Sequence, residues 1–250
     1  MANSFFVPGT ERAAKVRSLF DQIAPKYDLI NDIQSFGLHR LWKRKVARLA
    51  NAQRGDRVLD VCCGTGDLAA RFARTAAHVV ALDFSVQMLD HAVKRHASSR
   101  QIHFVRADAL QLPFRDETFD VVTIGYGLRN LAEWEMGVEE MIRVLKPGGR
   151  VVVLEFGRPN SALWRSIYFA YLRLFVPVLG LVFCGNAAAY GYILESLKSY
   201  PGQQAVAKKM EQLGLNAGNS NILGGAMAIT WGTKSGDQNL QKHAEIRQNS

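Results

Sequence analysis

A glycine-bracketed turn between an apolar run and a helix-like segment limits the possible folds of this chain more than any other feature. The turn is Asp60–Asp67, with the sequence DVCCGTGD, and an apolar stretch beginning at Arg57 leads into it. Gly64 and Gly66 carry no Cβ, so the backbone can turn sharply there and approach a ligand. A helix that begins near Asp67 presents free backbone N–H groups at the same place. The turn therefore predicts a nucleotide-binding α/β fold.

Strand-like segments alternate with helix-like segments through the middle of the chain. Strands are predicted at 57–63, 78–84, 102–108, 119–127 and 150–156. Helices are predicted between them at 67–74, 86–96 and 134–145. Continuously apolar strands separated by helices indicate a parallel sheet that is covered on both faces. We therefore predict an α/β fold with a doubly wound, mostly parallel sheet.

The two ends of the chain are expected to add to this core within a single domain, residues 1–234. Residues 1–50 are predicted to form a helical N-terminal cap, and residues 160–200 a segment that covers the substrate. A helix near 203–213 precedes two strand-like runs, 219–223 and 226–232, which predict a C-terminal antiparallel hairpin with Gly224–Gly225 at its turn. Residues 235–250 are polar and lack periodicity, so a disordered tail is expected.

Charge and cysteine usage narrow the partners and the compartment. The chain has 31 Lys plus Arg against 22 Asp plus Glu, a net charge of +9, which suits nucleic acid, an anionic membrane surface or an acidic ligand. The densest basic cluster, Arg40–Lys45 with Arg48 behind it, indicates a solvated helix face or a membrane-surface patch. Basic and aromatic residues do not interleave, so no nucleic-acid partner is expected. The three cysteines lack metal-ligand spacing, which predicts no metal site and a cytoplasmic location.

An uncharged segment raises the question of a membrane span. Residues 174–194 contain 21 consecutive uncharged residues, enough to cross a bilayer. Pro177 and several glycines interrupt the segment, and its strongly apolar part ends at Cys184. These interruptions favour a buried or interfacial segment, with peripheral contact to a membrane surface, over a spanning helix.

Three carboxylates at successive strand ends favour S-adenosylmethionine over NAD as the ligand of the glycine turn. Gly64–Ala69 also satisfies G-x-G-x-x-A, so the dinucleotide interpretation, and with it an NAD-dependent oxidoreductase, stays open. Asp60 would attract the ammonium of a methionine moiety and repel a pyrophosphate. Asp83 is expected to accept from ribose hydroxyls, and Asp108 from an adenine amino group. Alternatively, all three carboxylates cap loops.

Several stretches resemble a known family. LDVCCGTGD, ALDFS, RADALQLPF, FDVVTIGYGLRN and RVLKPGGRVVVLEF resemble the successive motifs of class I S-adenosylmethionine-dependent methyltransferases. Tyr27–Trp42, YDLINDIQSFGLHRLW, resembles the N-terminal signature of the menaquinone/ubiquinone biosynthesis C-methyltransferase family. The similarity extends from about Arg17 to Lys234. Cys62 stands where many methyltransferases have glycine, and Asn186 where the family often has aspartate.

The resemblance implies a reaction and a set of site residues. The expected reaction is methyl transfer from S-adenosylmethionine to a ring carbon of a prenylated quinol, demethylmenaquinol above all, with a methoxy-benzoquinol or another small phenol as alternatives. The apolar stretch 168–183 would contact the isoprenoid tail, and a homodimer at the inner face of the membrane is also expected. The expected cofactor-binding residues are Asp60, Gly64, Thr65, Gly66, Asp83, Phe84, Asp108, Ala109 and Gly125.

The chemistry of this reaction points to candidate catalytic residues. A ring carbon becomes nucleophilic when the neighbouring hydroxyl loses its proton, so the site must stabilise a phenolate and accept a proton. Arg129 is expected to stabilise the phenolate, and Asn130 to hold a water or the ring oxygen. His39, three residues before Trp42 on one helix face, is a candidate base or else a packing residue. Tyr27 is expected to help close the N-terminal segment over the cofactor.

Overall fold

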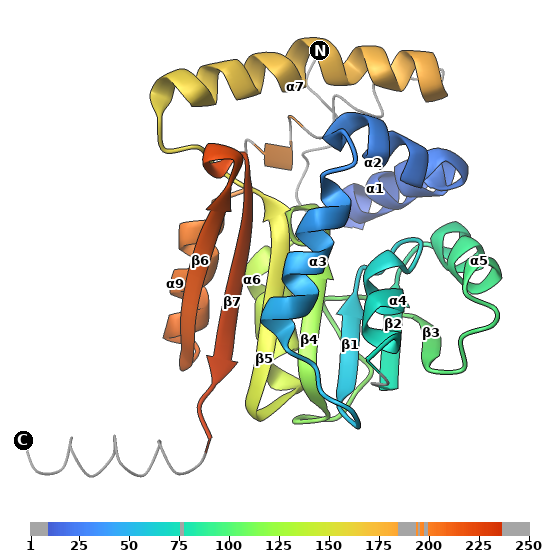
Figure 1. The fold of residues 1–250 in the computed structure, drawn as a ribbon, viewed down its shortest axis with the longest axis vertical. Helices are drawn as coiled ribbons and strands as arrows, with labels where there is room; N and C mark the ends of the chain where they lie inside the picture. Colours follow the sequence, from blue (N-terminus) through green and yellow to red (C-terminus); the bar gives the residue numbers. More distant parts are fainter. Residues whose placement is uncertain (1–9, 76–77, 185–193, 195, 198–199, 237–250) are drawn as a thin grey trace, which may run out of the picture.

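The computed structural model describes residues 10–75, 78–184, 194, 196–197 and 200–236, and a central sheet organises this part of the chain (Figure 1). The sheet has seven strands in the order β3-β2-β1-β4-β5-β7-β6. The first five in this order pair in parallel, whereas β7 is antiparallel to β5 and β6 is antiparallel to β7. The strands are β1 (Arg57–Val61), β2 (His78–Asp83), β3 (Ile102–Arg106), β4 (Phe119–Gly125), β5 (Leu145–Phe156), β6 (Leu215–Ile222) and β7 (Met227–Lys234). The predicted fold class is confirmed.

Helices cover both faces of the sheet, which explains why its central strands are apolar along their whole length. In Figure 1, α3 (His39–Ala50) and α4 (Asp67–Ala73) lie in front of the sheet, and α6 (Trp134–Arg143) and α9 (Gln203–Gln212) lie behind it. Val152 of β5 packs with the front helices, whereas its neighbours Val151 and Val153 pack with the helices behind. α5 (Val86–Arg95) lies against β3, and Ser85 caps its N-terminus because Ser85 Oγ accepts from Met88 N at 3.1 Å.

The strand order determines where a ligand can bind. β1 lies between β2 and β4. The chain adds β2 and β3 on one side of β1, then crosses over and adds β4 and β5 on the other side. A crevice forms at the carboxyl ends of parallel strands at such a switch point. The turn that follows β1 therefore faces the end of β4.

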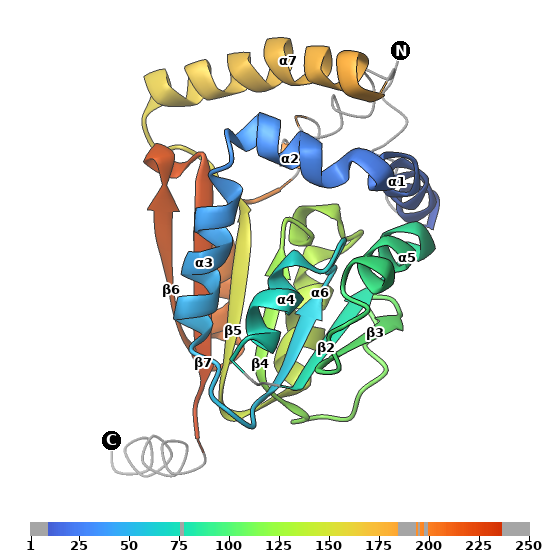
Figure 2. The same cartoon turned by 45° about the vertical axis from the view of Figure 1, so that its right-hand side comes forward.

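Helices from three parts of the chain lie over this edge of the sheet. They are α1 (Thr10–Ile23), α2 (Tyr27–Ser35, after the short helix η2, Ala24–Lys26) and α7 (Ala162–Cys184). Figure 2 shows α7 and α2 crossing above the strand ends. The Tyr171 hydroxyl joins these two helices by donating to the Gln34 carbonyl at 2.9 Å. Within the described ranges, no helix combines the length and the apolarity that crossing a bilayer requires.

The C-terminal hairpin is longer than predicted. β6 begins at Leu215 rather than 219, because its small polar residues carry no hydrophobic alternation and only the ladder with β7 reveals the strand. The hairpin turn is the short helix η4 (Leu223–Gly225), in which Gly224 and Gly225 have φ values of 62° and 94° that suit glycine. β5 likewise begins at Leu145 rather than 150, with a register shift near its start. Asn186 and residues 237–250 lie outside the described residues.

Candidate active site

Two neighbouring cavities lie between the strand ends and the helices that cover them. The smaller has a volume of about 130 Å³ and the larger about 340 Å³. Phe20, Tyr27 and Tyr126 line both cavities, and the rings of Phe20 and Tyr27 meet edge to face with centroids 6.2 Å apart. We call these three residues the aromatic wall. The two cavities therefore adjoin at these three side chains, and ligands bound in them would lie side by side.

The smaller cavity lies at the ends of β1, β2 and β4. Asp83 is its most constrained residue, because its Oδ2 accepts from Gly64 N at 2.8 Å and its Oδ1 from Ser85 N at 2.9 Å. Burial nevertheless raises the pKa of Asp83, so a cationic ligand here would favour the charged carboxylate. The predicted residues that line this cavity are Gly64, Asp83, Phe84, Asp108, Ala109, Gly125 and Asn130.

Asp60 does not line the smaller cavity, although its position in the sequence predicted a direct cofactor contact. Its buried carboxylate accepts from Thr123 Oγ1 at 2.9 Å and from Ala69 N at 3.1 Å. Burial is also the main cause that raises the pKa of Asp60 to about 7. Asp60 therefore fixes the first turn of α4 relative to β4 and acts on the cavity from behind.

Thr65 and Gly66 also lie outside the cavity lining and shape the turn instead. The Thr65 hydroxyl donates to Asp28 Oδ1 at 2.8 Å, which joins the glycine turn to α2. Gly66 is the N-cap of α4 with φ 79°, and a Cβ there would lie 2.9 Å from the His96 ring. Asp28 also accepts from Arg95, so these contacts hold the N-terminal helices over the turn.

The basic cluster Arg40–Lys45 is partly engaged within the protein. Lys43 is buried and pairs with Asp67 at 3.0 Å, and Lys45 donates to Ser220 at 3.0 Å. Arg40 pairs with Asp32 at 2.5 Å. Lys43 and Lys45 are thus engaged within the protein, whereas Arg40, Arg44 and Arg48 stay exposed on α3.

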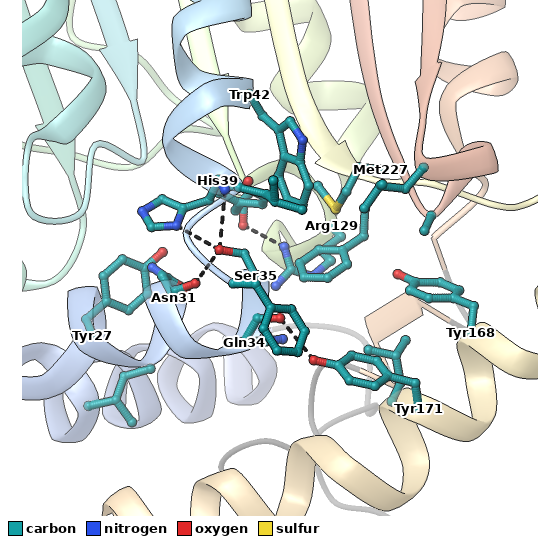
Figure 3. Close-up of a pocket in the computed structure, with 18 of the residues that line it drawn as sticks. Tyr27, Asn31, Gln34, Ser35, His39, Trp42, Arg129, Tyr168, Tyr171 and Met227 are labelled. Atoms are coloured by element: carbon teal, nitrogen blue, oxygen red, sulfur yellow. Dashed lines mark hydrogen bonds between the residues drawn. The ribbon is translucent and has the colours of Figure 1, made fainter.

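The larger cavity is apolar and comes mainly from the added helices, not from the sheet. Figure 3 shows side chains of α2, α3 and α7 converging on it together with Met227 at the start of β7. Its aromatic residues, beyond the aromatic wall, are Phe36, Trp42, Phe156, Trp164, Tyr168 and Tyr171.

Arg129, in the short helix η3 (Leu128–Asn130), lines the larger cavity and is only 6% exposed. Its guanidinium pairs with Glu155 at 2.6 Å, donates to the Tyr126 carbonyl at 2.8 Å and lies 4.6 Å from the centroid of the Phe156 ring. Arg129 Nε also donates to Ser196 at 3.2 Å. This buried ion pair and the accompanying hydrogen bonds fix the direction of the guanidinium.

His39 lies at the start of α3 and lines the larger cavity with Trp42. Its Nδ1 lies 2.9 Å from Ser35 Oγ, and the Ser35 hydroxyl donates to the Asn31 carbonyl at 2.6 Å. Because the serine has a single hydroxyl hydrogen, Nδ1 must donate and Nε2 carries the lone pair. Burial is the main cause that lowers the pKa of His39, so the imidazole is neutral near pH 7.

Asn130 and Arg129 are adjacent in sequence but line different cavities. Asn130 Nδ2 donates to the Tyr126 carbonyl at 3.1 Å, the same oxygen that Arg129 uses. Tyr126 has φ 62°, a conformation that is uncommon outside glycine and often occurs at functional sites. The turn Tyr126–Asn130 therefore supplies polar groups to both sides of the aromatic wall.

Sequence reasoning missed several of these residues. Tyr126 stands between two glycines and Glu155 is a lone acid in an apolar strand, and both patterns could have marked them. Phe20 gave no such signal. Tyr27, predicted to close the N-terminal segment, is partly buried in the aromatic wall, and the resulting desolvation of its hydroxyl raises its pKa to about 12.

The smaller cavity suits S-adenosylmethionine better than a dinucleotide. Asp67 occupies the first turn of α4, where a pyrophosphate would bind, and pairs with Lys43 and Arg95. Asp83 and Asp108 offer carboxylates to hydroxyl and amino groups. An acidic lining of this kind suits a cationic sulfonium ligand.

Comparison with known proteins agrees with this geometry. Residues 9–234 match the model of the ubiE/COQ5 methyltransferase family. The chain is 42% identical to the "Ubiquinone/menaquinone biosynthesis C-methyltransferase UbiE" of Azotobacter vinelandii, over 91% of this chain and 93% of that protein. It is 41% identical to the protein of the same name from Pseudomonas fluorescens, over 91% and 92%.

Solved structures resemble the fold at low sequence identity. A SAM-dependent methyltransferase from Aquifex aeolicus superposes with a TM-score of 0.59 at 16% identity, covering 82% of this chain and 97% of that one. Haemonchus contortus phosphoethanolamine N-methyltransferase 2, solved with S-adenosyl-L-methionine, also gives 0.59 at 14% identity, covering 78% and 52%. With the match over residues 9–234, these findings show that the chain belongs to the ubiE/COQ5 methyltransferase family and is an S-adenosylmethionine-dependent C-methyltransferase.

Proposed function

We propose that the protein methylates a ring carbon of a prenylated quinol, and that this quinol is demethylmenaquinol. The observation that carries the proposal is the aromatic wall, across which an acidic cavity for the methyl donor meets an apolar cavity that holds one buried arginine. An aromatic ring with an apolar tail matches the lining of the larger cavity. The names of the relatives from Azotobacter vinelandii and Pseudomonas fluorescens support the same substrate class.

In the proposed reaction, the smaller cavity binds the methyl donor and the larger cavity binds and activates the quinol. Bound S-adenosylmethionine supplies an electrophilic methyl group. The ring hydroxyl beside the acceptor carbon gives its proton to His39, and the carbon then forms its new bond to the methyl group as the methyl–sulfur bond breaks and S-adenosylhomocysteine leaves. The hydrogen on that carbon moves as a proton to the ring oxygen and restores the hydroxyl, so that one proton in total is passed to His39. Arg129 donates to the phenolate oxygen from a fixed position, which lowers the barrier more than a mobile cation would. The neutral His39, with a lone pair on Nε2, is the proposed proton acceptor.

The helices that cover the cavities keep water out of this reaction. Tyr27 stays protonated at neutral pH because its pKa is raised to about 12, so it adds no charge beside the reacting ring. Arg129 lines the cavity, and its ion pair with the buried Glu155 balances its charge. A dry, preorganised site strengthens the interaction of the guanidinium with the developing phenolate.

We further propose that the outward side of α7 contacts the membrane surface that supplies the quinol. The inward side of this helix contributes Tyr168 and Leu172 to the larger cavity. Its exposed apolar residues are Leu163, Trp164, Ile167, Leu174, Phe175, Val178, Leu181 and Val182, of which Trp164 and Ile167 also line the larger cavity. A helix with one apolar side in solvent is typical of interfacial binding. The cytoplasmic location and the homodimer stay predictions from the sequence.

The test is a methyl-transfer assay with two acceptors. The purified protein is incubated with S-adenosylmethionine and either demethylmenaquinol or the corresponding methoxy-benzoquinol that lacks the ring methyl, and mass spectrometry follows the gain of one methyl group. We expect efficient transfer to the naphthoquinol. Preferred transfer to the benzoquinol would assign the alternative substrate, and transfer to neither would refute the proposed function.

A further inference from the structure

Buried polar atoms without a hydrogen-bond partner gather in the larger cavity. Within the described residues, four side-chain atoms are buried and unpaired: Gln34 Nε2, Arg71 Nε, Tyr126 Oη and Tyr168 Oη. All of these except the arginine atom belong to residues that line the larger cavity. A buried polar atom without a partner destabilises a fold, so such atoms are rare unless a ligand or a water pairs with them. Their concentration here indicates polar groups on the substrate.

Tyr168 is the most buried of these residues, with 7% of its surface exposed. In Figure 3 its hydroxyl points away from α7 into the space that Arg129 also faces. Burial raises the pKa of Tyr168 well above its usual value, with a smaller opposing effect from Arg129. The group is therefore a neutral hydroxyl that can both donate and accept.

Gln34 supplies a second unpaired group from the opposite helix, α2. Its backbone carbonyl accepts from the Tyr171 hydroxyl, which holds this part of α2 beside α7. Its Nε2 carries two hydrogens with no acceptor in the described part of the chain. Gln34 and Tyr168 thus present at least one donor each from helices that are not part of the sheet.

A quinol has two ring oxygens, and they need different partners. Only the oxygen beside the acceptor carbon can push charge into that carbon, and the proposed reaction assigns this oxygen to Arg129. The other oxygen lies across the ring and is buried when the substrate binds. It must find a hydrogen-bond partner there, because leaving it unpaired would cost affinity.

We propose that Tyr168 and Gln34 bind this second ring oxygen and thereby select acceptors with two opposed oxygens over simple phenols. The inference rests on the proposed function and adds the groups that determine its specificity. A site built to pair a substrate oxygen discriminates strongly against an analogue that lacks it. Tyr126 belongs to the aromatic wall that lines both cavities, and its hydroxyl is not part of this pair.

The experiment compares Tyr168→Phe with a matched control on the same helix, Tyr171→Phe. Tyr171 also lines the larger cavity, but its hydroxyl is already paired with the Gln34 carbonyl. Each variant is assayed with the quinol and with a monophenol analogue that lacks the second oxygen. Thermal unfolding without ligands is measured in parallel.

For Tyr168→Phe we expect an unchanged or higher melting temperature, because the substitution removes an unpaired buried hydroxyl. KM for the quinol should rise about tenfold, the loss of one good hydrogen bond, while KM for the monophenol stays the same. Gln34→Met should reduce the preference for the quinol in the same direction. Tyr171→Phe should lower the melting temperature and leave the preference between the acceptors intact.

Two results would overturn the inference. One is an unchanged preference for the quinol in Tyr168→Phe, and the other is a melting temperature that falls as far as in Tyr171→Phe, which would show that the hydroxyl is paired without substrate. Failure of the proposed function gives a different result, because the wild-type protein would then methylate neither the quinol nor the monophenol.

Discussion

The two cavities on either side of the aromatic wall are built in different ways. The smaller is formed by loops at the ends of the parallel strands, where glycines and carboxylates set the backbone and Asp83 accepts from two backbone N–H groups. The larger is formed by side chains of α2, α3 and α7, added from both ends of the chain. The donor site thus belongs mainly to the shared α/β core, with α1 and Tyr27 covering it, whereas the acceptor site belongs mainly to the additions. Substitutions in α3 and α7, which do not line the smaller cavity, can therefore change the acceptor without disturbing the donor site.

The largest expected effect tests whether Arg129 serves the chemistry of the larger cavity or only its structure. Arg129→Leu leaves Glu155 buried without its counter-ion, so we expect a loss of about 3–5 kcal/mol in the free energy of unfolding, measured with urea. The double variant Arg129→Leu/Glu155→Leu should regain most of this stability and still transfer no methyl group. A stable double variant that remained active would show that the ion pair is purely structural.

Asp83 tests whether the smaller cavity can be damaged alone. Asp83→Asn leaves one of the two backbone N–H groups without its acceptor, so binding of S-adenosylhomocysteine should weaken about 100-fold in calorimetry, or about 3 kcal/mol. Quinol binding without cofactor, followed by tryptophan fluorescence, should not change. Asp90→Asn, on the exposed side of α5, is the matched control. An equal loss of quinol affinity would contradict the separate construction of the two cavities.

Cys62 and Gly127 test how closely the loops of the smaller cavity pack. Cys62 has φ 53°, and a Cβ added at Gly127 would lie 2.5 Å from the Cβ of Cys62. Gly127→Ala should therefore cost about 1–3 kcal/mol in thermal unfolding. Adding Cys62→Gly removes the clash and suits the left-handed backbone, so the double variant should recover most of the loss. If the double variant does not recover stability, the strain arises instead at Ile124, which the same Cβ would also approach.

The smallest effect concerns the pH dependence of stability through Asp60, behind the smaller cavity. Its pKa is raised from 3.8 to about 7 in the folded protein, so folding retains a proton that the unfolded chain has released. The resulting stabilisation is complete below pH 4 and is lost as pH rises through 7. Between pH 6 and pH 8 the free energy of unfolding of Asp60→Asn should therefore fall by about 1–2 kcal/mol less than that of the wild type, measured by urea unfolding. Parallel curves for the two proteins would refute the raised pKa.

The same contrast explains how much the sequence could predict. The fold class and most of the residues around the smaller cavity follow from short motifs, because a strand end, a glycine turn and a carboxylate lie within a few residues of one another. The larger cavity is assembled from residues far apart in sequence, such as Gln34, Tyr168 and Met227. Glu155 lies in an apolar strand, and its role is visible only in the structure, because its partner Arg129 is distant in the sequence. Asp60 lies behind the lining of the smaller cavity, which strand position alone could not reveal, because it does not say which way a side chain points.

The aromatic wall has a thermodynamic consequence. Phe20, Tyr27 and Tyr126 contact whichever ligand binds first, so ordering these rings for one ligand prepares the surface for the other. By linkage, any factor by which the methyl donor tightens the quinol must equal the factor by which the quinol tightens the donor. When the methyl group is transferred, the donor in the smaller cavity loses its positive charge and the quinol in the larger cavity gains a methyl group. Both changes occur beside the aromatic wall, so the reaction itself can weaken the binding of both products.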